Sequence, residues 1–251
     1  MSKLLENQVC IITGAGKGFG RTMADTFYKH GAKLALITRS KEDVICLNEE
    51  LNIPSANILT YCGDVTEPET VNDFITQVIK KFGRIDVLVN NAGMRFRKPF
   101  LETTLDEFKN VLDVNVGSMF LLCQSVLPHM LEHKQGKIIN MSSVAGTLGL
   151  PELSSYVTSK AAIIGLTKSL ALEFAENNIQ INSVAPGFCK TSYFENFKEK
   201  SELYKFTLDR TPMHRWGESE EIANACVFLA SNLSDYITGE VMSVDGGWSA
   251  W

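Results

Sequence analysis

Seven short and almost uninterrupted apolar runs alternate with longer segments along this chain of 251 residues. Apolar runs of this length without polar alternation are typical of strands in a sheet that is covered on both faces. The seven runs are Val9–Thr13, Leu34–Thr38, Ile58–Cys62, Val87–Asn90, Lys137–Met141, Ile179–Val184 and Val241–Val244. Segments of helical length between them include Arg21–His30, Pro68–Phe82, Leu105–His133, Ser154–Asn177 and Ser219–Ser231.

This alternation predicts an α/β fold with a doubly wound, seven-stranded parallel sheet and helices on both faces. No linker, charge block or repeat divides the sequence, so we expect one domain over residues 1–251. In such a sheet, ligands bind at the carboxyl ends of the strands.

Composition narrows the class of function. Twenty-four basic and 29 acidic residues give a formal net charge of −5, which argues against a nucleic-acid surface. No uninterrupted apolar run approaches the roughly 18 residues of a membrane span, and the first eight residues have no signal-peptide character. The six cysteines lie far apart, with no C-x-x-C pair, so we expect reduced thiols, no metal site and a cytoplasmic protein.

Residues 13–20 (Thr-Gly-Ala-Gly-Lys-Gly-Phe-Gly) follow the first predicted strand and open the first predicted helix. Glycines in this position let the backbone approach a pyrophosphate, whose charge then faces the helix N-terminus. A glycine-rich turn without a ligand is the alternative. The predicted dinucleotide-binding residues of the loop are Gly14, Gly16, Lys17, Gly18, Phe19 and Gly20.

The end of the second predicted strand favours NADP(H) over NAD(H). An NAD-selective site would offer an acidic residue there for the ribose 2′-hydroxyl, but residues 37–40 read Ile-Thr-Arg-Ser. Arg39 can bind a 2′-phosphate with two hydrogen bonds, and Lys17 adds a second cation. A surface arginine without a ligand is the simpler interpretation.

Tyr156 and Lys160 stand four positions apart on a predicted helix, 13 residues after Ser143. Positions four apart share a helix face, so both side chains can meet one cofactor. A phenol has a reference pKa of about 10, and a fixed cation beside it favours the phenolate. In isolation the pattern is also compatible with a solvated pair on a helix surface.

Together these motifs resemble the short-chain dehydrogenase/reductase family over about residues 7–248. The resemblance rests on the glycine-rich loop, on residues 90–93 (Asn-Asn-Ala-Gly), on Ser143 with Tyr156 and Lys160, and on residues 244–247 (Val-Asp-Gly-Gly). Phe19 stands where a smaller aliphatic residue is usual, and Cys189 stands where valine or isoleucine is usual. Neither change removes a chemical group.

The resemblance implies a single Rossmann domain, an oxidoreductase acting on alcohols and ketones, and a homotetramer. It implies that Tyr156 exchanges a proton with the substrate oxygen, Ser143 binds that oxygen, Lys160 holds the nicotinamide ribose and Asn115 holds a water. Gly117 fits a helix irregularity beside Asn115. The further cofactor residues that it implies are Asp64, Val65, Asn90, Ala92, Gly93, Pro186, Gly187, Cys189 and Thr191, together with Tyr156 and Lys160.

The substrate is less clearly indicated. Residues 190–215 contain aromatic and charged residues, as in a lid that closes over a substrate or in a surface helix. The cations Arg95, Arg97 and Lys98 resemble the gluconate 5-dehydrogenase group and suggest an anionic sugar acid, with Arg95, Arg97, Ser143 and Tyr193 as substrate residues; solvated loop charges are the alternative.

Two other functions remain open. The C-terminal third of the chain equally resembles 3-oxoacyl-acyl-carrier-protein reductases, although the acidic Glu173 and Glu176 would repel an acidic carrier. A cofactor-binding regulatory protein without turnover is a function of a different class. The complete Ser, Tyr, Lys and Asn set argues against it.

Overall fold

Seven parallel strands form one sheet in the computed structural model, which describes residues 3–191 and 194–250. The strand order is β3-β2-β1-β4-β5-β6-β7, and each neighbouring pair is parallel. The strands are β1 (Val9–Thr13), β2 (Lys33–Thr38), β3 (Ile58–Cys62), β4 (Val87–Asn90), β5 (Gly136–Met141), β6 (Ile179–Pro186) and β7 (Val241–Val244). The predicted sheet is therefore confirmed.

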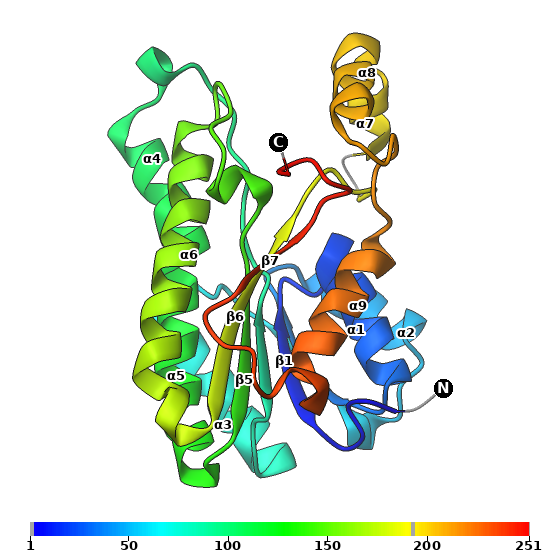
Figure 1. The fold of residues 1–251 in the computed structure, drawn as a ribbon. Coiled ribbons are helices and arrows are strands. Elements are labelled where there is room, and N and C mark those ends of the chain that lie inside the picture. Colours follow the sequence, from blue (N-terminus) through cyan, green and yellow to red (C-terminus); the bar gives the residue numbers. More distant parts are fainter. Residues whose placement is uncertain (1–2, 192–193, 251) are drawn as a thin grey trace.

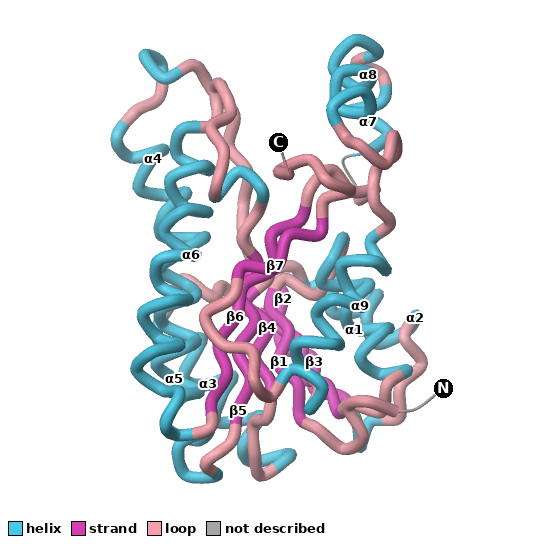
Figure 2. Tube along the Cα trace, viewed as in Figure 1, coloured by secondary structure: helices cyan, strands magenta, loops and turns pink. Residues whose placement is uncertain are grey.

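Helices cover both faces of this sheet (Figure 1). Helices α1 (Gly18–Lys29) and α9 (Ser219–Ala230) lie on one face. Helices α3 (Pro68–Phe82), α5 (Ser118–His133) and α6 (Ser154–Phe174) lie on the other. The strands run between these two layers, as the tube in Figure 2 shows.

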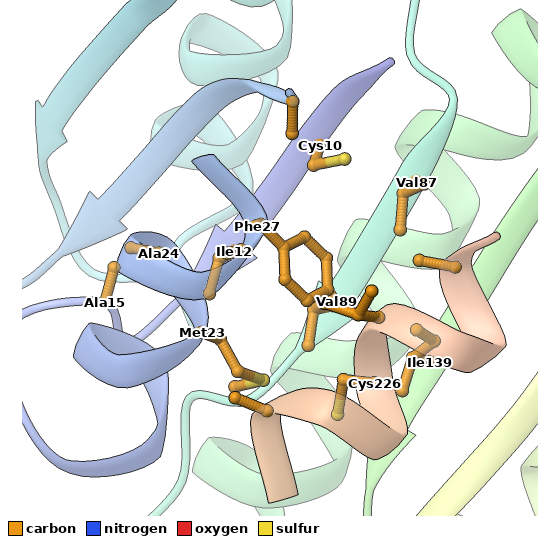
Figure 3. Packing of buried hydrophobic residues seen from close by; sticks show 14 of the residues in the cluster. Cys10, Ile12, Ala15, Met23, Ala24, Phe27, Val87, Val89, Ile139 and Cys226 are labelled. Carbon is orange, nitrogen blue, oxygen red and sulfur yellow. The ribbon is translucent and has the colours of Figure 1, made fainter. Parts of the chain in front are cut away.

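Alternate strand residues enter two hydrophobic clusters, because successive side chains of a strand point to opposite faces. In β1, Cys10 and Ile12 join the cluster under α1 and α9, whereas Val9 and Ile11 join the cluster under α3, α5 and α6. Phe27 of α1 is fully buried in the first cluster (Figure 3). Burial on both faces explains why the strands read as continuous apolar runs.

The predicted segment Leu105–His133 consists of three parts. Helix α4 (Leu105–Leu112) begins with a capping box, in which Thr104 accepts a hydrogen bond from the Glu107 N–H and Glu107 accepts one from the Thr104 N–H. A π-helical turn (Asp113–Gly117) then joins it to α5. The irregularity expected beside Gly117 is confirmed.

By length and composition alone, Leu105–His133 is also apolar enough to cross a membrane. In this fold, however, many of its apolar side chains pack against the sheet. Leu122, Val126 and Met130 are buried against the sheet in the second cluster. The segment therefore has the composition of a core helix.

Helix α2 (Lys41–Glu50) was not among the expected segments, and Leu47 is the one buried residue of this helix, so its sequence carries almost no apolar pattern. Among the described residues of the segment 190–215, Phe194–Lys198 form helix α7 and Ser201–Arg210 form helix α8, where one lid helix was expected.

Candidate active site

The glycine-rich loop turns tightly between β1 and α1. The Gly14 N–H donates to the Ile37 carbonyl at 2.9 Å, and Gly14 has a positive φ of 63°. A Cβ atom at Gly20 would overlap the Gly14 carbonyl oxygen. Lys17, which precedes α1, makes no side-chain cap, so it leaves the first N–H groups of this helix to a ligand. This loop fits the pyrophosphate of a dinucleotide.

Asn91 ties the end of β4 to this loop, and the sequence interpretation did not single it out. Its side-chain Nδ2 donates to the Thr13 carbonyl at 2.9 Å. The Thr13 hydroxyl accepts from the backbone N–H groups of Asn91 at 3.0 Å and Ala92 at 2.9 Å. Asn91 is the second residue of the Asn-Asn-Ala-Gly motif, and this position in the sequence could have indicated its structural role.

Asn90 is the last residue of β4 and is buried. Its side chain is buried between strands, where Nδ2 donates to Asn140 Oδ1 at 2.9 Å and lies 3.4 Å from Cys123 Sγ. This amide therefore links β4 to β5 and packs against α5. The Asn90 Oδ1 is buried and has no hydrogen-bond partner within the part of the chain that the structure describes. The predicted contact of Asn90 with the cofactor stays a prediction.

The predicted adenosine residues gather beyond β2 and β3. Asp64 is fixed by hydrogen bonds from the Thr66 N–H at 3.0 Å and hydroxyl at 2.8 Å. Arg39 lies with one guanidinium nitrogen 4.0 Å from an Asp64 oxygen, and its side chain is 82% exposed. An ion pair so long and exposed is weak, so it leaves Arg39 able to bind an anionic ligand. Lys17 is exposed, and Val65 is buried.

Tyr156 and Lys160 project from α6 on the same side, as expected. Lys160 Nζ donates to the Met141 carbonyl at 2.7 Å and lies 5.6 Å from the centre of the Tyr156 ring. Ser143, at the end of β5, accepts from the Ala145 N–H at 3.1 Å. A Cβ atom at Gly93 would lie 3.8 Å from Lys160 Nζ. The glycine thus leaves open the space beside this amine.

The two side chains of the tyrosine–lysine pair respond differently to burial. Burial raises the pKa of Tyr156 above its ordinary value, while a hydrogen bond with Ser143 and the positive charge of Arg95 oppose the rise. Burial lowers the pKa of Lys160 to about 8. Desolvation of the phenolate therefore outweighs the Ser143 hydrogen bond and the Arg95 charge. The expected lowering of the tyrosine pKa by the lysine and the oxidised nicotinamide ring stays a prediction.

Asn115 lies on the π-helical turn and is buried. Its Nδ2 donates to the Met94 carbonyl at 3.0 Å and to the Ser159 hydroxyl at 2.9 Å. Its Oδ1 accepts from the Met94 N–H at 2.7 Å. The side chain thus fixes the loop after β4 against α6, next to Gly93 and Lys160.

The segment after β6 contains the predicted residues for the nicotinamide end of the cofactor, from Pro186 to Thr191. The Gly187 N–H, directly after Pro186, donates to the Val244 carbonyl at 3.0 Å, and a Cβ atom at Gly187 would lie 2.7 Å from the Asp245 Cα. Cys189 is buried, and burial raises the pKa of its thiol to about 12, so the thiol is a weak nucleophile. The Thr191 carbonyl accepts from the Phe194 N–H at 2.9 Å. Tyr193 lies outside the described residues.

The loop after β4 separates the three expected cations. Arg97 forms an ion pair with Glu152 at 2.8 Å, and Lys98 forms one with Glu107 at 2.8 Å. The charge of Arg95 acts on the Tyr156 hydroxyl. Arg97 is therefore paired within the loop region, and the expected binding of a substrate by Arg95 and Arg97 stays a prediction.

A cavity of about 450 Å³ lies beyond Cys189, between the loop after β6 and the N-terminal end of α9. Its described lining includes Met213, Glu221 and Gly246, and none of Ser143, Tyr156 and Lys160. It is therefore separate from the catalytic set. Within residues 3–191 and 194–250, no three His, Cys, Asp or Glu side chains gather closely enough to hold a metal ion.

Comparison with known proteins extends over almost the whole chain. Residues 14–249 match a family model described as "Enoyl-(Acyl carrier protein) reductase". The 3-oxoacyl-[acyl-carrier-protein] reductase FabG of Thermotoga maritima is 39% identical over 97% of this chain and 98% of its own length. The 5-keto-D-gluconate 5-reductase of Escherichia coli (strain K12) is 36% identical over 94% of this chain and 93% of its own.

A solved structure, titled "ElxO with NADP Bound", has the same fold. It superimposes with a TM-score of 0.92 at 35% sequence identity, over 98% of this chain and all of its own (100%). The solved structure therefore shares the complete fold, and the two relatives matched by sequence bear names with different substrates.

Proposed function

Because this chain belongs to the short-chain dehydrogenase/reductase family, we propose that it is an NADP(H)-dependent oxidoreductase that interconverts a secondary alcohol and a ketone on a small anionic substrate such as a sugar acid. The observation that carries the reaction is that Tyr156 and Lys160 lie on one side of α6, with Lys160 Nζ 5.6 Å from the centre of the Tyr156 ring. The substrate class is supported by the 5-keto-D-gluconate 5-reductase among the relatives. A substrate oxygen bound at the Tyr156 hydroxyl would also be exposed to the positive charge of Arg95, which acts on this hydroxyl.

The cofactor fits the carboxyl end of the sheet. The glycine-rich loop and the N-terminus of α1 would hold the pyrophosphate, while Arg39 and Lys17 would bind a 2′-phosphate. Asp64 and Val65 would border the adenine, and the segment Pro186–Thr191 the nicotinamide. When bound, NADP(H) supplies or accepts the hydride.

The chain's own side chains move the proton. Tyr156 donates a proton to the carbonyl oxygen during reduction and takes it back during oxidation. Burial raises the pKa of this phenol above its ordinary value and so favours its protonated form. Ser143 donates a hydrogen bond to the same oxygen and stabilises developing negative charge.

Lys160 and Asn115 hold this arrangement in place. The Lys160 amine, bonded to the Met141 carbonyl beside Gly93, would bind the nicotinamide ribose. Asn115 keeps the loop after β4 at a fixed distance from α6 through Met94 and Ser159. It would also hold the water through which Lys160 exchanges protons with solvent.

Arg95 would bind the carboxylate of the substrate. A guanidinium can donate two parallel hydrogen bonds to a carboxylate, which fixes the orientation of the remaining carbon chain. With the oxygen on Ser143 and Tyr156, a second point of attachment at Arg95 would align the reacting carbon with the nicotinamide. The 5-keto-D-gluconate 5-reductase among the relatives is named for a substrate of this class.

Reduction of an acyl chain on a carrier protein is the second candidate, and the 39% identical relative favours it. The surface of α6 argues against it. Leu172 is 83% exposed, and the neighbouring Glu173 and Glu176 are exposed acids. This face would repel an acidic carrier. A regulatory role without turnover is not favoured by any of the relatives named above.

We further propose a cytoplasmic homotetramer. Large apolar side chains are exposed on the helices of one face, among them Leu105, Phe120 and Leu172. Apolar surface of this kind is typical of an interface between copies of a chain. Residues 190–215, with α7 and α8, would form the lid.

The test is NADPH oxidation against a panel of carbonyl compounds. We expect turnover with 5-ketogluconate and related keto acids, together with gluconate oxidation in the reverse direction. Strong activity on an acetoacetyl carrier protein, with none on free keto acids, would favour the second candidate. Absence of turnover with the whole panel, despite NADPH binding, would support the regulatory role.

A further inference from the structure

An acidic side chain lies against the glycine-rich loop, although the end of β2 contains none. Asp43 belongs to the first turn of α2, five positions beyond Thr38. A Cβ atom at Gly16 would overlap its carboxyl group and would lie 2.6 Å from the Asp43 Cβ. The fold thus brings a carboxylate from the next helix to the loop that we assign to the cofactor.

The position of this carboxylate is fixed from two sides. The Thr38 hydroxyl donates to Asp43 Oδ2 at 3.1 Å. The Asp43 N–H donates to the Ser40 hydroxyl at 3.2 Å, which caps α2. The side chain is half-buried. It is therefore held toward Gly16 rather than extended into solvent.

Charges of both signs consequently surround the place where the adenosine ribose would bind. Arg39 and Lys17 are exposed cations, and Arg39 leans toward Asp64 at 4.0 Å. Asp43 is the acid packed on the loop itself. Glu42, the other acid of the same helical turn, is exposed and accepts from the Ser40 hydroxyl at 2.7 Å.

We propose that Asp43 is a selectivity residue: its carboxylate accepts hydrogen bonds from the ribose diol of NAD(H) and opposes the 2′-phosphate of NADP(H). A ribose 2′-hydroxyl is a donor that an acid at this edge of the sheet can bind. A 2′-phosphate carries only acceptor oxygens and negative charge, so a nearby carboxylate disfavours it. Arg39 and Lys17 act in the opposite sense.

It follows that the chain binds both cofactors, with a shallow preference for NADPH. This inference rests on the proposed cofactor use and adds the residue that limits selectivity. Asp43 also supports α2 as an acid in its first turn, and a purely structural role would leave the ratio of the two affinities unchanged.

The experiment compares Asp43→Asn with Glu42→Gln. Each variant removes one negative charge from the first turn of α2, but only Asp43 lies against Gly16. Dissociation constants of NADPH and NADH are measured by the fluorescence of the reduced nicotinamide, without a substrate. Titration calorimetry with 2′,5′-ADP and 5′-AMP repeats the comparison on fragments that lack the nicotinamide.

In Asp43→Asn we expect the ratio of the NADH to the NADPH dissociation constant to rise about tenfold, as loss of one nearby charge implies. Glu42→Gln should change this ratio less than twofold. An unchanged ratio in Asp43→Asn, or an equal rise in Glu42→Gln, overturns the proposal. If the unaltered chain binds neither dinucleotide, the proposed function itself fails. Asp43→Ser, which keeps a short polar side chain at this helix position, repeats the test if the first variant does not fold.

Discussion

Tyr156 is the residue on which the proposed chemistry depends most directly. Replacing it with phenylalanine removes the proton donor and leaves the ring, so the packing beside Lys160 is retained. We expect Tyr156→Phe to lower turnover by a factor of about 10²–10⁴, as for loss of a general acid. NADPH affinity, measured by fluorescence, should stay within about twofold. Near-normal turnover would contradict the assigned role.

Variants of Arg95 and Arg97 can distinguish a role in substrate binding from a role in loop structure. Loss of a charged hydrogen bond costs about 1.5–3 kcal/mol, so Arg95→Ala should raise the KM for a keto acid about tenfold or more. The KM for neutral ketones should stay near its original value, whereas a change in turnover through the Tyr156 hydroxyl should be shared by both substrate types. Arg97 is bound to Glu152, and we expect Arg97→Ala, the matched control, to affect acidic and neutral substrates alike. Equal kinetics of Arg95→Ala on both substrate types would refute the anion site.

Lys160 makes stability depend on pH in a predictable direction. Its pKa is about 8 in the folded protein, below the ordinary 10.5. Between these values the unfolded chain holds a proton that the folded protein has released, so this group makes the free energy of unfolding rise with pH.

Compared with Lys160→Met, the free energy of unfolding of the unaltered protein should gain on the order of 2 kcal/mol between pH 8 and 10. Denaturant titrations at several pH values measure this. The buried thiols oppose the trend because burial raises their pKa, as for Cys123 and Cys226, but they do so equally in both proteins. Parallel pH curves would show that Lys160 is not the source.

At the scale of elements, the buried indole of Trp216 contacts both helices of the proposed lid. Trp216 packs against Phe188, Phe194 and Tyr204, with ring centres 5.2 to 5.7 Å apart. Its Nε1 donates to the Thr207 hydroxyl of α8 at 2.8 Å. Both helices of the proposed lid therefore contact the same buried side chain beside the loop after β6.

We expect Trp216→Ala to release α7 and α8 from the domain. Limited proteolysis should then cut faster within residues 194–210, and the KM should rise more than turnover falls. Phe206→Ala serves as the control, because that side chain is 53% exposed and lies beside Trp248 instead. An unchanged cleavage pattern in Trp216→Ala would refute this role of Trp216.

The elements differ in how far sequence reveals them. A strand such as β4 is buried on both faces, so its apolar run predicts it directly. Helix α2 buries little more than Leu47 and carries no pattern strong enough to detect. The pairing of Arg97 with Glu152 joins residues 55 positions apart, and no local periodicity encodes such a contact. The sequence did not predict the position of Asp43, because this residue approaches the glycine-rich loop from the first turn of α2 and not from the end of β2.

At the scale of the whole molecule, the exposed apolar side chains predict assembly. Phe120 and Leu172 are 52% and 83% exposed on α5 and α6. We expect light scattering at micromolar concentration to give the mass of four chains. The double variant Phe120→Asp/Leu172→Asp should give a smaller particle. Ile45→Asp, a change on α2 at a side chain of 55% exposure, should leave the mass unchanged. A monomeric parent would contradict the assembly.

The ties of the loop after β4 have a consequence for protein engineering. Lys98 donates its backbone N–H to the Glu152 carbonyl at 2.9 Å, and the Glu152 carboxylate binds Arg97. The loops that follow β4 and β5 are therefore held together by direct contacts, although they are far apart in the sequence. Grafting either segment alone from a relative would leave broken contacts behind it. Recombination libraries that seek new substrates should therefore exchange residues 94–98 and 147–153 as a single block.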